Sequence, residues 1–309
     1  MSEKRSLITK RFVQISLGAL WILDAALQLQ HQMFTSAFAN SVIAPVAAGQ
    51  PAAIYGPIHF EVHLLLLHPA IFNSIFALIQ LLLGLLILFK RTARAGLVLS
   101  VFWVLGVWFF GEGLGGLLSG TTTLWMGAPG AVIFYGILAL SVLPKHKSKS
   151  SDERPAYWLP IVWAVTWVGG SLLQLQSTQS STRAVSSMIV GMSQGAPRWL
   201  VNLDVHTASF FSVRGFGFII FLLVIQIIIG LLIFFPGTLR KLAISLGIIM
   251  AFLIWLFGEN LGEFYTGRAT DPNSGPLLIL LGIAILGCSN YGFSKLWQKT
   301  WSDLEKIIT

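Results

Sequence analysis

Charged residues are scarce in this chain: they make up 10% of its 309 residues, whereas 55% are hydrophobic. A soluble domain carries about 25% charged residues, so this chain has too few to cover a surface in water. Several apolar runs approach the roughly 20 residues that a helix needs to cross a bilayer. The composition therefore predicts a multi-pass membrane protein whose main partner is the lipid bilayer.

Cysteine is almost absent, because Cys288 is the only one. A single thiol excludes an internal disulfide and any metal or cluster site built from several cysteines. The sequence also lacks a Walker A loop, a GxGxxG element before a helix, a CxxC pair and a plausible serine triad. These absences disfavour nucleotide-driven transport and the hydrolytic chemistry of soluble enzymes.

An excess of positive charge, +8 at pH 7, raises the question of a nucleic-acid partner. The distribution of Lys and Arg answers it, since sixteen of the twenty fall in short clusters that flank apolar runs. Such clusters mark the cytoplasmic side of membrane proteins. We therefore expect no nucleic acid, a place in the cell membrane, and cytoplasmic N- and C-termini.

The apolar runs between these clusters predict an all-α membrane protein with eight transmembrane helices. The predicted spans cover about 11–31, 69–89, 95–113, 128–144, 157–176, 212–235, 243–262 and 275–294. The connections 32–68 and 177–211 are long and moderately apolar, and we expect them to form interfacial helices on the outer side.

The chain also contains an internal repeat. Leu27–Gln30 recurs as Leu173–Gln176, and WFFGEGLGG (Trp108–Gly116) recurs as WLFGENLGE (Trp255–Glu263), at offsets of 146 and 147 positions. Further pairs at these offsets are Gln80 with Gln226 and Pro129 with Pro276. We predict a first four-helix repeat at 1–146, a basic cytoplasmic linker at 147–156 and a second four-helix repeat at 157–309. Because each repeat has an even number of spans, the two are expected to be parallel.

Two carboxylates stand at equivalent places in the repeats, near the outer ends of the third and seventh predicted spans. Glu112 and Glu259 each follow an aromatic run that ends in glycine. An ionisable residue inside a span costs about 2.5–3.5 kcal/mol on insertion scales, so both are candidate ligand or proton sites. The alternative is structural: each carboxylate caps backbone groups where its helix breaks. Trp108 and Trp255 are candidates for contact with a flat apolar ligand.

Further polar residues reach the same level of the first predicted span. Asp24, Gln28 and His31 are spaced i, i+4 and i+7, so we expect them on one helix face. In the second repeat Gly170 replaces Asp24, whereas Gln174 matches Gln28. Asp24, Gln28 and Gln174 therefore join the candidate ligand or proton sites.

Histidines gather before the second predicted span. His59 and His63 are one helical turn apart, a spacing that suits Zn or Cu, and His206 stands near the matching place in the second repeat. These three are candidate metal ligands, and a histidine that faces a cavity is also a candidate haem ligand. The alternative is that the imidazoles lie at the membrane interface without a ligand.

Each repeat resembles a DoxX-type four-helix membrane module. The resemblance rests on ALWILDAALQLQ (Ala19–Gln30), on Gln80 with Gly84, and on WFFGEGLGG with its second copy. The chain is also similar to duplicated membrane proteins of Gram-positive bacteria that carry ATDPNSGP, here Ala269–Pro276. The DoxX/DoxD group includes membrane subunits of quinone-linked sulfur oxidation. The resemblance therefore implies a redox role, but it transfers no catalytic residues.

Three functions remain open from the sequence. The first is a subunit of a quinone-linked redox system that binds quinone, haem or a metal near the outer leaflet and assists a membrane or extracytoplasmic redox protein. The second is a proton- or cation-coupled small-solute transporter, in which Glu112 and Glu259 carry the charge. The third is a non-catalytic assembly or structural factor whose polar residues hold its own helices together. Whether the protein is an enzyme stays open.

Overall fold

The computed structural model describes residues 9–144, 154–176, 186–187, 189–191, 193 and 195–288, without the side chains of 213–216. Every regular element in this part of the chain is a helix. The α-helices are α1 (Lys10–Gln28), α2 (Ala52–Leu67), α3 (Pro69–Leu88), α4 (Ala93–Phe110), α5 (Ala131–Val142), α6 (Leu159–Leu173), α8 (Arg198–Leu232), α9 (Thr238–Leu253) and α10 (Ser274–Gly287). The short 3₁₀ and π helices are η1 (His31–Phe34), η2 (Phe38–Ile43), η3 (Ala44–Ala47), η4 (Gly113–Gly116), η5 (Leu124–Met126), η6 (Ile254–Gly258) and η7 (Asn260–Glu263).

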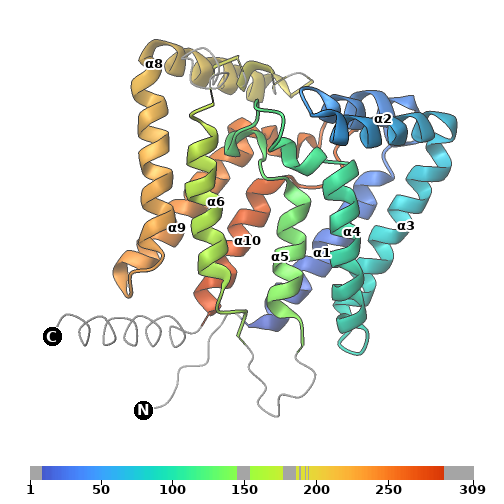
Figure 1. The fold of residues 1–309 in the computed structure, drawn as a ribbon, viewed down its shortest axis with the longest axis horizontal. Coiled ribbons are helices and arrows are strands. Elements are labelled where there is room, and N and C mark those ends of the chain that lie inside the picture. The colour runs from blue at the N-terminus through green and yellow to red at the C-terminus, as the bar shows by residue number, and fades with distance from the viewer. Residues whose placement is uncertain are drawn as a thin grey trace.

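The helices form two bundles that stand side by side (Figure 1). In the first bundle, α1 and α4 each pack against both α3 and α5. In the second bundle, α6 and α9 each pack against both α8 and α10. The two bundles meet where α5 contacts α10, and one apolar core runs through both of them. The helix order and the pairings are therefore the same in both halves.

Glycine allows a close contact between α1 and α3 in the first bundle. A Cβ atom on Gly84 of α3 would lie 2.8 Å from the carbonyl oxygen of Gly18 in α1, which is closer than any real side chain approaches. Small residues at such positions let two backbones pack closely, as they do between membrane helices. This contact fixes α1 against α3 and so positions the polar outer end of α1.

Each predicted span contains a helix, but the helices differ in length. Three segments are long and apolar enough to cross a membrane: Pro69–Leu88, Ala93–Phe110 and Thr238–Gly258. A fourth is added if the two halves of α8, bent by 103°, count as one span. Helices α5, α6 and α10 contain only 12, 15 and 14 residues. At 1.5 Å per residue, α5 is about 18 Å long, short of a bilayer core of about 30 Å. Helix length and apolar composition together therefore support three or four spans rather than eight.

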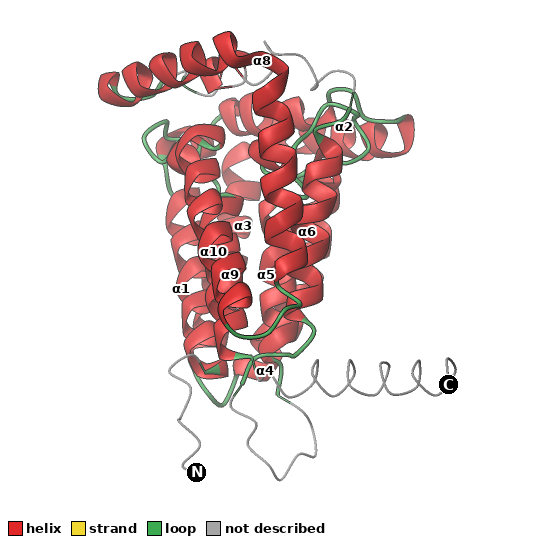
Figure 2. Cartoon of the chain, turned by 90° about the vertical axis from the view of Figure 1, so that its left-hand side faces the viewer, coloured by secondary structure: helices red, strands yellow, loops and turns green. Residues whose placement is uncertain are grey.

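A layer of helices lies across one end of both bundles. It contains α2 over the first bundle and the first half of α8 over the second, and both run across the bundle axes (Figures 1 and 2). Both long connections thus contain helices where the structure describes them, and residues 177–185, 188, 192 and 194 of the second connection lie outside the described part. The predicted linker 147–156 is described only from residue 154, and the last predicted span only to residue 288.

Candidate functional site

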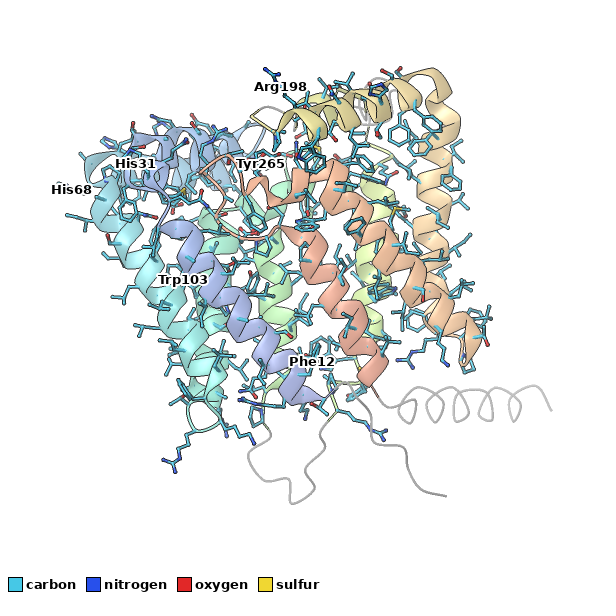
Figure 3. All side chains as sticks on the ribbon, turned by 180° about the vertical axis from the view of Figure 1, so that it is seen from behind. Phe12, His31, His68, Trp103, Arg198 and Tyr265 are labelled. Atoms are coloured by element: carbon cyan, nitrogen blue, oxygen red, sulfur yellow. The ribbon has the colours of Figure 1, made fainter. Side chains whose placement is uncertain are left out.

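A cavity of about 390 Å³ lies inside the first bundle, and residues of α2 and η2 form part of its lining. The lining is mainly apolar and rich in rings. Its polar residues are Asp24, Gln28, Glu61, Gln80, Glu112, Thr270 and Asp271, and its aromatic residues are Trp21, Phe38, Phe60, Phe72, Phe76, Trp103, Phe110 and Tyr135. Figure 3 shows Trp103 among the bundle helices, below the layer that carries His31 and His68. The size and lining are those of a small-molecule site.

Four carboxyl groups border this cavity, those of Asp24, Glu61, Glu112 and Asp271, and they come from different parts of the chain. Asp24 of α1 accepts a hydrogen bond from the Tyr135 hydroxyl at 2.9 Å. Glu112, just after α4, accepts the backbone N–H of Val132 at 2.9 Å through Oε1. Asp271 comes from the loop before α10, so it belongs to the second half of the chain. The site therefore combines residues from both bundles.

Asp271 is held by its own loop. Its Oδ1 accepts the backbone N–H of Asn273 at 2.8 Å, and its Oδ2 accepts the Thr270 hydroxyl at 2.7 Å. The surrounding protein removes the carboxyl group from water and thereby raises its pKa, while these two hydrogen bonds oppose the rise. The described residues that line the cavity include no lysine, arginine or histidine. The four carboxyl groups therefore have no positive partner among the described lining residues.

Several buried polar atoms of the lining have no hydrogen-bond partner. Gln28 is 3% exposed and Gln80 is 7% exposed, yet the side-chain Oε1 of each is unpartnered. Glu112 Oε2 and Glu61 Oε2 are also buried and unpartnered, as is the indole Nε1 of Trp103. Burial raises the pKa of Glu61 to about 7. Native structures normally satisfy buried polar groups, so this cluster calls for a functional explanation.

The loop after α4 has a backbone path that brings Glu112 to the start of α5. Leu114 and Gly115 have φ angles of 57° and 62°, in the left-handed region. A Cβ atom on Gly115 would lie 2.0 Å from the Pro129 carbonyl, so only glycine fits there. Trp108 donates its indole N–H to the Pro129 oxygen at 2.7 Å. Trp108 therefore ties this loop to the start of α5 rather than lining the cavity.

The loop after α9 has the same geometry. Leu261 and Gly262 have φ angles of 54° and 72°, and Trp255 donates its indole N–H to the Pro272 oxygen at 2.9 Å. These hydrogen bonds make Pro272 the structural counterpart of Pro129. The alignment of Pro129 with Pro276 at a constant offset is therefore wrong, because the second loop is four residues shorter at this point.

Glu259 differs from Glu112 in how fully it is bonded. Its Oε1 accepts the backbone N–H of Ser274 at 3.0 Å and also the Ser274 hydroxyl, and its Oε2 accepts the N–H of Gly275 at 2.8 Å. Both oxygens thus cap the start of α10, whereas Glu112 uses only Oε1 as a cap and leaves Oε2 free. A purely structural role as a helix cap accounts for both oxygens of Glu259 but for only one oxygen of Glu112.

The second bundle has no acidic counterpart of Asp24. Gly170 stands where Asp24 does in the repeat, and a Cβ atom on Gly170 would lie 2.9 Å from the side chain of Leu124, which comes from the first bundle's outer loop. Gln174 is buried at the end of α6 with neither amide atom hydrogen-bonded. Gln174, Trp255 and Glu259 are not part of the cavity lining.

The candidate metal ligands lie outside the cavity. His59 and His63 are exposed on α2, where the His59 ring stacks on Tyr55 with centroids 5.7 Å apart. His206 is exposed on α8, and its Nδ1 lies 2.6 Å from the Asn202 carbonyl oxygen. Among the residues that the structure describes, no group of three or more His, Cys, Asp or Glu side chains is placed to hold a metal ion.

The structure brings together some of the residues predicted as candidate sites and adds others. Asp24, Gln28 and Glu112 do meet at one cavity. His31 was expected on the face of Asp24 and Gln28, which is wrong: α1 ends at Gln28, and His31 is exposed in η1. Tyr135 and Asp271 were not singled out. The only sequence signal for Asp271 was its place in the conspicuous ATDPNSGP stretch.

Comparison of the chain with protein-family models, with curated protein sequences and with solved structures finds no match.

Proposed function

We propose that this protein is an eight-helix protein of the cell membrane that exchanges protons for a small solute at the cavity of its first bundle. In this proposal two parallel four-helix repeats span the bilayer, and both termini are cytoplasmic. The equal helix pairings of the two bundles support the repeat, as do the matching loops around Glu112 and Glu259. The short helices α5 and α10 follow loops that pack against protein, and irregular backbone is tolerated at membrane depth in such places.

One observation carries the functional part of the proposal. Asp24, Glu112 and Asp271 border a single cavity whose described lining contains no basic residue. Ionisable groups held in such a place are expensive and usually functional. Carboxyl groups that share a site without a counter-ion favour holding protons until a ligand or an added charge replaces them. That behaviour is what a proton-coupled carrier requires.

The experiment is proton flux in liposomes that contain the purified full chain and a pH-sensitive dye. A panel of cationic, zwitterionic, neutral and anionic small solutes is added against an imposed pH gradient. We expect at least one solute to dissipate the gradient with the wild-type protein and not with empty liposomes. Asp24→Asn and Glu112→Gln should abolish this flux, since each amide retains an oxygen that can accept the existing hydrogen bond but loses the titrating group.

The matched control is Glu263→Gln, which removes a carboxylate outside the cavity lining. It should leave the flux unchanged. If no solute moves protons beyond the empty-liposome rate, or if Asp24→Asn and Glu112→Gln both behave as wild type, the carrier proposal is wrong.

A second candidate is the DoxX-like subunit of a quinone-linked redox system. The observation in its favour is the unpartnered indole N–H of Trp103, a donor for a quinone carbonyl within an aromatic lining. Such a subunit needs a membrane or extracytoplasmic redox partner to supply or remove electrons. Quinone should then be extracted from protein purified from native membranes and be lost in Trp103→Phe, but not in the exposed control Trp199→Phe. Absence of extractable quinone would rule out this candidate.

The third candidate, a structural or assembly factor, accounts for Glu259, whose two oxygens are both used within the fold. It offers no reason for the unpartnered atoms around the first cavity. Normal growth of cells that carry Asp24→Asn with Glu112→Gln, together with unchanged flux, would favour it over the carrier.

A further inference from the structure

We infer that the cavity of the first bundle takes a protonated organic amine with an apolar, ring-sized body, which reaches the site sideways between α2 and α4. This inference rests on the proposed function in one respect, that the cavity is the ligand site. It adds the chemical class of the ligand and its route.

The first step is the balance of unpartnered atoms. Four buried oxygen acceptors of the lining have no hydrogen-bond partner: Gln28 Oε1, Gln80 Oε1, Glu61 Oε2 and Glu112 Oε2. Among the described lining atoms that are both buried and unpartnered, Trp103 Nε1 is the one donor. An ammonium group brings several N–H donors for acceptors of this kind. A carbonyl compound brings only acceptors and leaves most of the set unsatisfied.

The second step is charge. The carboxyl groups of Asp24, Glu112 and Asp271 border the cavity, and no described lining residue is basic. Burial of a carboxylate without a partner is costly, so these groups either hold protons or bind a cation. A cationic ligand supplies the missing charge and displaces protons when it binds. Acceptor count and charge thus favour the same class of ligand.

The third step concerns the rings. The Trp21 and Tyr135 rings lie 4.5 Å apart, and the Phe76 and Trp103 rings lie 5.7 Å apart, with all four side chains in the lining. Aromatic faces attract ammonium groups and pack well against a flat apolar body. The cavity volume of about 390 Å³ lies in the range of drug-sized ligand sites, about 300–1,000 Å³.

The fourth step is access. Phe60 of α2 and Phe110 of α4 line the cavity, although 63% and 40% of their surfaces are exposed. The lining therefore reaches the molecular surface between these two helices. In a membrane this surface faces lipid near the outer boundary, where amphiphilic amines concentrate. An apolar amine can then reach the carboxyl groups without crossing open water.

The test uses three probes of similar shape on the purified full chain: 1-naphthylethylamine, its trimethylammonium analogue and 1-naphthylethanol. Binding is measured by titration calorimetry against matched detergent blanks. The amine should bind at least tenfold more tightly than the alcohol, which lacks charge. It should also bind more tightly than the trimethylammonium analogue, which is charged but has no N–H donor.

Variants locate the site. Glu112→Gln, Asp271→Asn and Gln80→Leu should each weaken amine binding at least tenfold, whereas Glu263→Gln should leave it unchanged. Intrinsic tryptophan fluorescence and the melting transition of each variant show whether it is folded. Equal binding of amine and alcohol, no binding of the amine, or wild-type affinity in folded Glu112→Gln and Asp271→Asn would each overturn the inference.

The two proposals fail separately. Proton-coupled flux of a neutral or anionic solute, with no amine binding, would overturn the ligand class and leave the carrier standing. Tight amine binding without any proton flux would leave the ligand class standing and overturn the carrier.

Discussion

Asp271, in the loop before α10, lines the same cavity as Asp24 of α1, although the two residues belong to different bundles. The second bundle is therefore part of the site even though the cavity lies within the first. A change in the loop 267–273 is expected to alter ligand binding between α1 and α4.

The two capping glutamates should differ in their contribution to stability. Loss of a helix-capping acceptor costs about 0.5–2 kcal/mol. We expect Glu112→Ala to destabilise the protein within this range and Glu112→Gln to cost little, because the amide oxygen can still accept the Val132 N–H. Glu259→Gln should cost more than Glu112→Gln, since both Glu259 oxygens accept hydrogen bonds. Melting temperatures in detergent measure the loss of stability in each variant. Equal losses in Glu112→Gln and Glu259→Gln would contradict this prediction.

Filling the cavity should block binding without harming the fold. Gly106 borders the cavity, and a Cβ atom there would meet nothing within 4 Å. Gly106→Leu places a side chain beside the ligand space and should weaken binding of 1-naphthylethylamine at least tenfold. The matched control is Gly169→Leu in α6, where a Cβ atom also meets nothing within 4 Å and the residue lies outside the lining.

Both leucine variants gain intrinsic helix propensity of about 0.5–1 kcal/mol, so both should fold. Calorimetric titration with 1-naphthylethylamine should show weak binding to Gly106→Leu and wild-type binding to Gly169→Leu. If the two variants bind the amine equally well, the cavity is not where the amine binds.

The layer formed by α2 should be more stable in acid. Burial raises the pKa of Glu61 from 4.5 to about 7, so the folded protein favours the protonated form. This contribution to stability is complete below about pH 4.5 and is lost as the pH rises through about 7. Glu61→Gln should reduce the dependence of the melting temperature on pH in this window. Parallel curves for the variant and the wild type would contradict the assignment to Glu61.

The membrane arrangement predicts a labelling pattern. In a Cys288→Ser background, single cysteines replace the exposed residues Ser41, His206, Lys90 and Lys241. An impermeant maleimide should label positions 41 and 206 in intact cells, and positions 90 and 241 only after the membrane is opened. Position 206 labelled like position 90 instead of position 41 would show that the repeats are not parallel.

The sequence predicted the elements better than their lengths. Each predicted apolar run contains a helix because lipid-facing and core positions both favour apolar residues. The runs could not reveal that α5 begins only at Ala131, since the loop before it is itself apolar and packs inside the protein, as buried Leu124 and Trp125 show. Hydropathy alone does not distinguish a buried irregular loop from the start of a helix.

Residues of the candidate site could be grouped from the sequence only where they lie on the same helix. Asp24 and Gln28 share a face of α1, so their spacing was sufficient to group them. Asp271 reaches the cavity through the contact between bundles, which no local pattern encodes. Tyr135 stands in an apolar run, where its hydroxyl bond to Asp24 leaves no sequence signature. The partner of each of these residues is set by tertiary packing.

Leu124 of the first half lies against Gly170 in the second, while Asp271 of the second half reaches the cavity of the first. In a symmetric dimer of two identical modules, both contacts would occur twice, and each module would need both the leucine and the aspartate. In a single polypeptide the two halves can differ, so that the first half contains the cavity and the second half contributes residues that complete its lining. Neither half, expressed alone, would contain the complete lining of this cavity.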